Sequence, residues 1–196
     1  MKIEFKYSRA LDRLSFELTG ESMRSYKIED FIKKLEEEWK AVEEKTIILI
    51  KTLTGVDVDD WRVYVSTTIP SYASISPLVL KITDNLFEAL DTLIYILTVK
   101  AIRMNEELKD RLNLMSIASG YSVSIFEKCI SMYVRFKILK KFYGEQEVWR
   151  IKYLISKRSS NDRIALNLYN ITIEKLKRDT PEDFMKTMVS FFTGET

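Results

Sequence analysis

Residues Asn85–Met104 read NLFEALDTLIYILTVKAIRM, and this stretch decides the fold class that we predict. Its apolar side chains cover most of the circumference of a helix, which is typical of a helix buried on all sides. Asn85 is a candidate N-cap, and Glu88 lies three residues on as its capping-box partner. We therefore expect a buried central helix around which the other elements pack.

Before this helix, the spacing of apolar residues changes from that of a β-strand to that of an α-helix. Ile3–Tyr7 and Leu14–Leu18 both alternate apolar and polar residues, so we expect a hairpin that turns at Arg9–Asp12. A helical period then predicts a helix over about Lys27–Leu53, with Gly55 as the glycine that follows its end.

Strand signals return between that first helix and the central one. Trp61–Val65 and Ile75–Ile82 are both rich in β-branched and aromatic residues. Pro77 lies within the second segment and cannot donate a ladder hydrogen bond. We therefore expect Ile75–Ile82 to be an edge strand.

The chain after Asn105 has a helical pattern throughout. We expect helices over Glu106–Ser119, from Ser124-x-x-Glu127 to Gly144, over Gln146–Lys157 and Arg163–Arg178, and after Thr180-Pro181. The fold class is α+β, with a small N-terminal sheet of about four strands and a packed helix, the buried central helix, and a helical C-terminal half. We expect one domain over residues 1–196, with the sheet-containing part at about 1–104 and the helical part at about 105–196.

Composition is that of a soluble globular protein, with 46% hydrophobic and 31% charged residues. The longest apolar stretch contains Glu88, Asp91 and Lys100, which argues against a membrane span, and the N-terminal residues lack a signal-peptide pattern. Cys129 is the only cysteine, so the sequence indicates a cytoplasmic protein without an internal disulfide. Gln and Cys are scarce and charged residues are abundant, a composition typical of proteins from thermophiles. AT-rich coding DNA would also produce much of this composition, and we favour the thermophilic source.

The absence of histidine excludes most catalytic classes. Without it there is no Ser-His-Asp triad, no Cys-His pair and no HExxH zinc site. Neither GxGxxG nor GxxxxGK[ST] occurs, so no phosphate-binding glycine loop is expected. Asp57–Asp60 has oxygen ligands for a hard cation, but a solvated loop before a strand is the favoured interpretation. We expect no catalytic residue, no cofactor and no metal ion.

A basic segment, residues 128–158, gives the second functional interpretation. It carries nine basic residues against two acidic ones, and six aromatic residues lie between them. Aromatic rings among cations can bind nucleic acid by stacking and by phosphate contacts, whereas at helical spacing rings more often face the core. The contacts expected for nucleic acid are Lys137, Lys140, Lys141, Arg150 and Lys152.

The order of elements over Lys27–Met104 carries a resemblance to a known family. A strand, an edge segment reading Ser74-Ile75-Ser76-Pro77 and a helix containing Thr92-Leu93-Ile94-x-x-Leu97 together resemble the zincin-type metallopeptidases of the HExxH class. In that family an edge strand lines the cleft and pairs with extended substrate. The next helix supplies two histidines to zinc and a glutamate as general base.

The resemblance implies that this chain is a degenerate member. Tyr95 and Val99 stand at the two ligand positions, and Ile96 stands at the position of the base. Ile96 and Val99 have no group that ligates a metal or transfers a proton. We therefore expect a non-catalytic protein that serves as a binding or scaffold module. A protein partner fits this role, while partner identity and oligomeric state have no signal in the sequence.

Overall fold

The computed structural model describes residues 3–19, 25–67 and 73–193. Within these residues the chain forms β1 (Ile3–Tyr7), α1 (Arg9–Thr19), α2 (Ser25–Thr54), β2 (Trp61–Ser66), β3 (Ala73–Ile75), β4 (Leu78–Lys81), α3 (Leu86–Met104), α4 (Glu106–Ser119), α5 (Val123–Tyr143), α6 (Glu145–Ser156), α7 (Ser160–Glu174) and α8 (Pro181–Thr193). The predicted α+β class, with four N-terminal strands and a helical C-terminal half, is confirmed.

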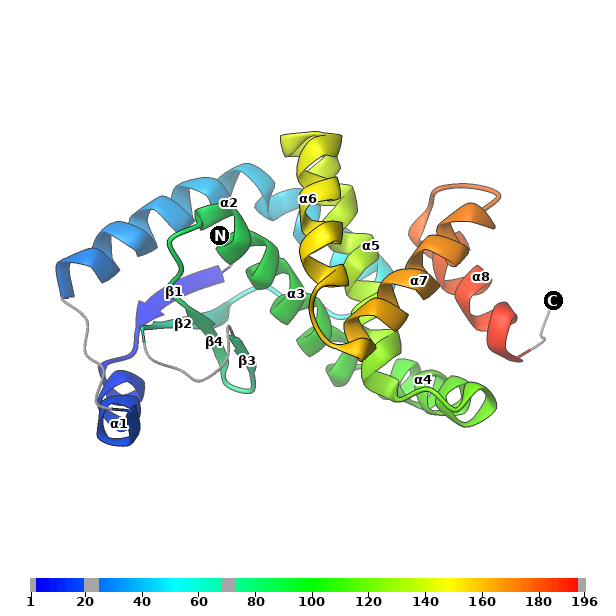
Figure 1. Cartoon of the computed structure of the whole chain (residues 1–196), viewed down its shortest axis with the longest axis horizontal. Coiled ribbons are helices and arrows are strands. Elements are labelled where there is room, and N and C mark those ends of the chain that lie inside the picture. Colours follow the sequence, from blue (N-terminus) through cyan, green and yellow to red (C-terminus); the bar gives the residue numbers. More distant parts are fainter. Residues whose placement is uncertain (1–2, 20–24, 68–72, 194–196) are drawn as a thin grey trace.

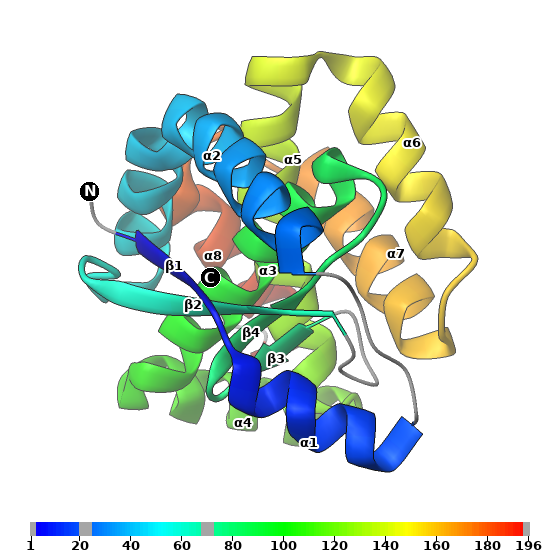
Figure 2. The ribbon, with the colours of Figure 1, turned by 90° about the vertical axis from the view of Figure 1, so that its left-hand side faces the viewer.

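The sheet has the strand order β1-β2-β4-β3. The first three of these run parallel, with Phe5 opposite Val63 and Val65 opposite Leu80, and β3 runs antiparallel to β4 at one edge. The sheet lies between α2 on one side and α1 on the other (Figures 1 and 2). Helix α2 packs on β1, α3 packs on β3 and β4, and the two helices pack against each other.

The predicted hairpin at the N-terminus is wrong, because the second segment is helix α1. The Ser8 hydroxyl accepts a hydrogen bond from the Leu11 N–H at 3.3 Å, which caps the first turn of this helix. The Asp12 carboxylate accepts hydrogen bonds from the Thr67 N–H at 2.9 Å and the Thr67 hydroxyl at 2.8 Å. These bonds fasten α1 to the end of β2, and β1 takes β2 as its partner instead.

The predicted edge strand Ile75–Ile82 is also wrong as a single element. Ser76 and Pro77 form a tight turn that joins β3 to β4, and the bond between them is cis. Because β4 pairs with β2 on its other side, it is an inner strand, and β3 is the edge. Proline needs no ladder partner in the turn, which is why it is tolerated there.

The predicted central helix is confirmed as α3. The Asn85 side chain accepts hydrogen bonds from the N–H groups of Phe87 at 3.0 Å and Glu88 at 3.3 Å. Its amide also donates to the Glu88 carboxylate at 3.1 Å, so the two side chains bond directly to each other. Helix α3 contacts α2, α4, α5 and the sheet, which explains why it is apolar on most sides.

The C-terminal helices begin and end close to the predicted residues. Gly55 and Gly120 follow α2 and α4 with φ of 68° and 72°, a left-handed conformation that glycine adopts without strain. The Thr180 hydroxyl accepts from the Asp183 N–H at 3.2 Å at the start of α8. The predicted start at Ser124-x-x-Glu127 is wrong: α5 begins at Val123, and the Glu127 carboxylate pairs with Arg103 of α3 and does not cap α5.

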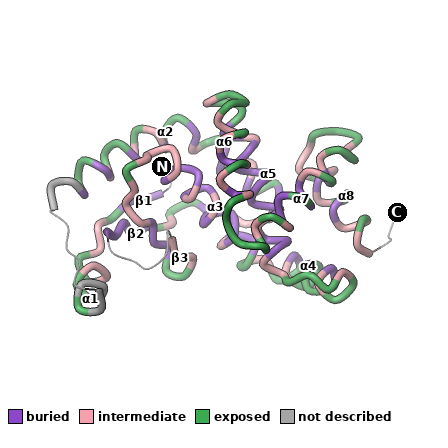
Figure 3. Tube along the Cα trace, viewed as in Figure 1, coloured by how far each residue is buried: buried purple, intermediate pink, exposed green. Residues whose placement is uncertain are grey.

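Buried apolar side chains form one connected cluster that runs from Ile3 in β1 to Met188 in α8. Figure 3 shows the buried trace following α3 and α5 through the interior, while much of α4 and α6 is exposed. Among the described residues, no helix combines the length and the apolar character needed to cross a membrane.

Candidate functional site

The three positions of α3 that the resemblance assigns to the zinc ligands and the base lie mostly in the hydrophobic core. Ile96 and Val99 have no exposed surface, and Tyr95 is half-buried. Side chains from α5 pack against this part of α3, because α3 and α5 form one of the most extensive helix pairs in the molecule. Buried isoleucine and valine leave neither space nor a polar group for a metal ion at these positions.

A buried ion pair lies one helical turn before Tyr95. Arg135 of α5 donates from Nε to Oδ1 of Asp91 at 2.6 Å, and its second nitrogen bonds to Oδ2. The two side chains are 5% and 2% exposed. A bidentate arginine pair satisfies both carboxylate oxygens, as charges in a core require. This pair therefore fixes α5 against α3.

Arg135 also lies over the ring of Tyr95, the residue at the first ligand position. Its guanidinium carbon lies 5.7 Å from the centroid of the Tyr95 ring. Burial raises the pKa of Tyr95 above its ordinary value, so the phenol keeps its proton at neutral pH. A protonated phenol is a poor metal ligand, and the residues present therefore do not fit zinc.

The three carboxylates that could serve as a third zinc ligand are held in ion pairs. Glu127 pairs with Arg103 of α3 through two bonds of 2.7 Å, Glu106 pairs with Lys109 and Glu107 with Arg111. In the part of the chain that the structure describes, no group of three or more potential metal ligands gathers. Glu127 thus joins α5 to α3, and Glu106 and Glu107 are paired within α4.

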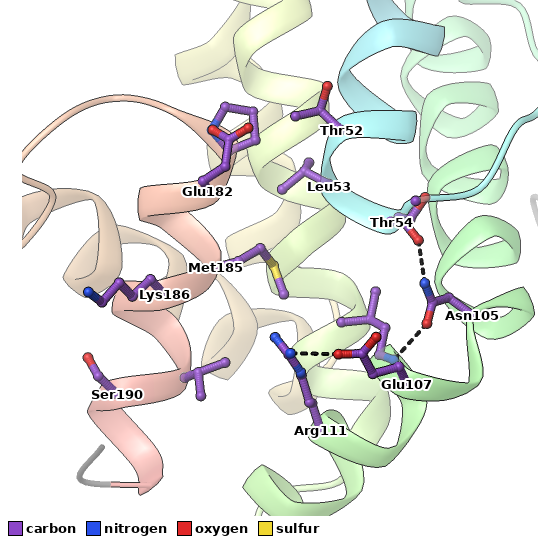
Figure 4. Close-up of a pocket in the computed structure, with 14 residues that line it drawn as sticks. Thr52, Leu53, Thr54, Asn105, Glu107, Arg111, Glu182, Met185, Lys186 and Ser190 are labelled. Carbon is purple, nitrogen blue, oxygen red and sulfur yellow. Dashed lines mark hydrogen bonds and ion pairs between the residues drawn. The ribbon is translucent and has the colours of Figure 1, made fainter. Parts of the chain in front are cut away.

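A groove of about 500 Å³ lies where the end of α2, the start of α4 and α8 meet (Figure 4). Asn105 joins two of these helices, because its amide donates to the Thr54 carbonyl at 2.7 Å while its Oδ1 accepts from the Leu108 N–H at 2.8 Å. The acidic and basic side chains on the rim balance one another: Glu107, Arg111, Glu182 and Lys186. The polar groups here cap and join helices, and the described lining includes no nucleophile paired with a base.

A second cavity, of about 600 Å³, lies beside the start of α3. The Tyr143 hydroxyl donates to Oε2 of Glu38 at 2.6 Å, and burial raises the pKa of this tyrosine. Arg150 lies over the Phe87 ring at 5.0 Å and pairs with Glu147 at 2.7 Å. These polar groups satisfy one another: the Tyr143–Glu38 bond joins α5 to α2, and Arg150 joins α6 to α3.

The five cations predicted to contact nucleic acid are distributed over α5 and α6, and three of them pair with carboxylates. Lys137 pairs with Asp179, Lys140 with Glu145, and Arg150 with both Glu147 and Glu88. Lys141 lies 5.9 Å from the Phe142 ring, and Lys152 bonds to the Asn170 side chain at 3.0 Å. Most of the positive charge of this segment is therefore balanced locally.

The aromatic residues of the basic segment divide between core and surface. Tyr133 and Phe136 are buried and Tyr143 is half-buried, as expected for rings at helical spacing. Trp149 and Tyr153 of α6, however, are 71% and 62% exposed. The outer face of α6 thus presents two large rings to solvent.

Sequence reasoning missed the Asp91–Arg135 pair, although one signal pointed to it. Asp91 is an acidic residue in the middle of an apolar helix, and a buried charge requires a partner. That partner is 44 residues away in the chain, so only the packing of α5 on α3 identifies it.

Comparisons with models of protein families, with curated proteins and with solved structures gave no match. The resemblance to zincins therefore stays a prediction.

Proposed function

We propose that this protein is a non-catalytic binding or scaffold module built on a degenerate zincin-like core. The observation that carries the proposal is the packing at the three positions where a zincin has its ligands and base. Ile96 and Val99 are buried, and Tyr95 lies beneath the guanidinium of Arg135. A zinc site needs polar groups and an open coordination position there.

The sheet edge supports the same proposal. Strand β3 is the antiparallel edge strand, and it packs against α3 as the resemblance implies for the strand that lines a zincin cleft. Its residues Ala73 and Ile75 pack on the same apolar cluster as Tyr95. On this proposal, packed side chains occupy the region that a zincin keeps open for substrate.

Elemental analysis of the purified protein tests this function. The protein is incubated with excess zinc and then dialysed, so that zinc held weakly by surface carboxylates is removed. We expect far less than one zinc per chain, because the α3 positions offer no ligand and the buried Cys129 has a pKa raised by burial. One zinc per chain after dialysis would overturn the proposal.

A second candidate function is nucleic-acid binding by residues 128–158. The observation that favours it is the exposure of Trp149 and Tyr153, with Lys152 and Lys157 lying against these rings at 6.0 and 5.2 Å. Exposed rings beside cations can stack with the bases of a single strand.

Binding of a labelled single-stranded oligonucleotide at about 50 mM salt tests this candidate, since phosphate contacts are strongest at low salt. If the function is correct, binding weakens steeply as salt increases. It should also be lost when Lys140, Lys141, Arg150 and Lys152 are neutralised together. Absence of binding at low salt would reject it.

A further inference from the structure

A cavity of about 270 Å³ lies between α5, α6, α7 and the connection that leads to α8. Its walls carry four aromatic rings, three lysines and two carboxylates: Tyr133, Phe136, Trp149, Tyr169, Lys137, Lys140, Lys152, Glu145 and Asp179. Aromatic side chains and charged side chains therefore line the same small cavity.

Lys152 is surrounded by rings on several sides. Its Nζ lies 5.1 Å from the centroid of the Tyr169 ring, 5.5 Å from that of Phe136 and 6.0 Å from that of Trp149. Its hydrogen bond goes to the neutral Oδ1 of Asn170 at 3.0 Å. Burial among these groups lowers the pKa of Lys152, which means that its charge is incompletely solvated.

The remaining charges of the cavity neutralise one another. Lys137 pairs with Asp179 at 3.1 Å, and Lys140 pairs with Glu145. Over the described ranges no carboxylate lies within ion-pair distance of Lys152. The cavity thus carries one uncompensated positive charge, and that charge is on Lys152.

Two other charged side chains with little exposure, one on α3 and one on α5, do have partners of opposite sign. Asp91 pairs with Arg135, and Lys128 of α5 pairs with Asp162 of α7 at 2.7 Å. A partly buried cation without a counter-ion costs free energy that an anionic ligand would recover. The difference between Lys152 and these paired residues therefore indicates a ligand.

We propose that this cavity binds a small anion that carries one planar ring. The anionic group pairs with the Lys152 ammonium, and the ring packs against Trp149. The volume is below the roughly 300–1,000 Å³ of sites for drug-sized ligands, so it suits a single ring with one acidic group. This inference goes beyond the proposed function and does not depend on whether α3 binds zinc.

Titration of the full-length protein with phenyl phosphate tests the proposal, with inorganic phosphate as the probe that lacks the ring. Trp149 reports binding by fluorescence, because it lines the cavity, whereas Trp39 is fully buried and Trp61 lies in β2 and does not line the cavity. Calorimetry then gives the affinity. We expect phenyl phosphate to bind, to change the fluorescence and to bind more tightly than inorganic phosphate, since ring packing adds to the ion pair.

Two matched variants separate the cavity from general attraction to positive charge. Lys152→Met should weaken phenyl phosphate binding by roughly ten- to a hundredfold, the factor expected for one hydrogen bond to a charged group. Lys157→Met removes the same charge from the residue that follows α6, outside the cavity, and should change the affinity less than about twofold. Methionine fills the ring-lined space, so the Lys152 variant should fold normally.

Three results would overturn the proposal. One is the absence of phenyl phosphate binding up to about 10 mM, which corresponds to less than roughly 3 kcal/mol of binding free energy. Another is unchanged affinity in the Lys152→Met variant. The last is equal weakening by both variants, which would place the anion on the outer surface of α6. The zinc content of the protein is independent of all three.

Discussion

Asp91 and Arg135 place two opposite charges in the core, where each depends on the other for solvation. Replacing Asp91 with alanine leaves the Arg135 guanidinium buried without a counter-charge, so we expect the free energy of unfolding to fall by about 3–5 kcal/mol. Denaturant titration measures this loss. The exposed pair Asp30–Lys34 provides the control, and Asp30→Ala should cost less than about 1 kcal/mol.

The double variant Asp91→Leu with Arg135→Met should recover most of that stability, because it removes both charges and keeps apolar volume. A double variant as unstable as Asp91→Ala alone would contradict this explanation. The ion pair would then stabilise the fold by more than the mutual compensation of its two buried charges.

Lys152 should make the stability of the protein depend on pH. Its pKa is lowered in the folded state, so the folded protein binds this proton less tightly than the unfolded chain does. The resulting destabilisation is complete below the folded pKa and disappears as the pH rises through that pKa to about 10.4, the unfolded value. We therefore expect Lys152→Met to be more stable than the natural protein at pH 7, and this advantage to shrink as the pH approaches 10.

Denaturant titrations of both proteins across this pH range measure the difference directly. Ionisation of Tyr133 and Tyr169 and the charges of Lys137, Lys140, Glu145 and Asp179 in the same cavity are common to both proteins and largely cancel. A difference that does not vary with pH would contradict the incomplete solvation of Lys152.

At the scale of elements, the caps of individual helices determine where they begin. Asn85 satisfies two N–H groups at the start of α3, so Asn85→Ala should lower the free energy of unfolding by about 1 kcal/mol. Ser122 precedes α5 without capping it, and Ser122→Ala should therefore have almost no effect. Thermal unfolding followed by circular dichroism compares the two variants, and equal losses would contradict the assigned caps.

The sequence predicted those elements whose signals are local. Asn85, Gly120 and Thr180 each mark a helix end through residues within one turn, and the helices begin and end close to them. Helix α1 was missed because its position depends on Asp12 bonding to Thr67, which is 55 residues away. The β3–β4 turn was missed for a similar reason, since only the pairing of β4 with β2 shows which strand is at the edge.

For the candidate sites, the sequence supplied residue types but not their surroundings. It identified Tyr95, Ile96 and Val99 as apolar or uncharged, and the structure adds that Arg135 covers the first of them. It placed Lys152 in a basic surface, whereas the ring-lined cavity around this residue requires the packing of α5, α6 and α7.

At the scale of the whole molecule, α3 connects the sheet to the helical half. It contacts α2 and the sheet on one side and α4 and α5 on the other, and all these contacts belong to one apolar cluster. A helix at the centre of such a cluster should open only when the whole protein unfolds. Native-state hydrogen exchange should therefore show the slowest amides in α3 and faster ones in α1 and α4. Fast exchange across the middle of α3 would be inconsistent with this arrangement.

Helix α3 is a core helix at Ile96 and Val99, two of the three positions to which the resemblance assigns the active site of a zincin. The free energy of unfolding of the Ile96→Glu variant tests this placement most directly, with Met104→Glu on the exposed end of the same helix as the control. We predict that Ile96→Glu loses more than about 4 kcal/mol, because it buries an unpaired charge, and that Met104→Glu loses less than about 1 kcal/mol. A loss below about 1 kcal/mol for Ile96→Glu would contradict the claim, because the carboxylate would then have water and space around it.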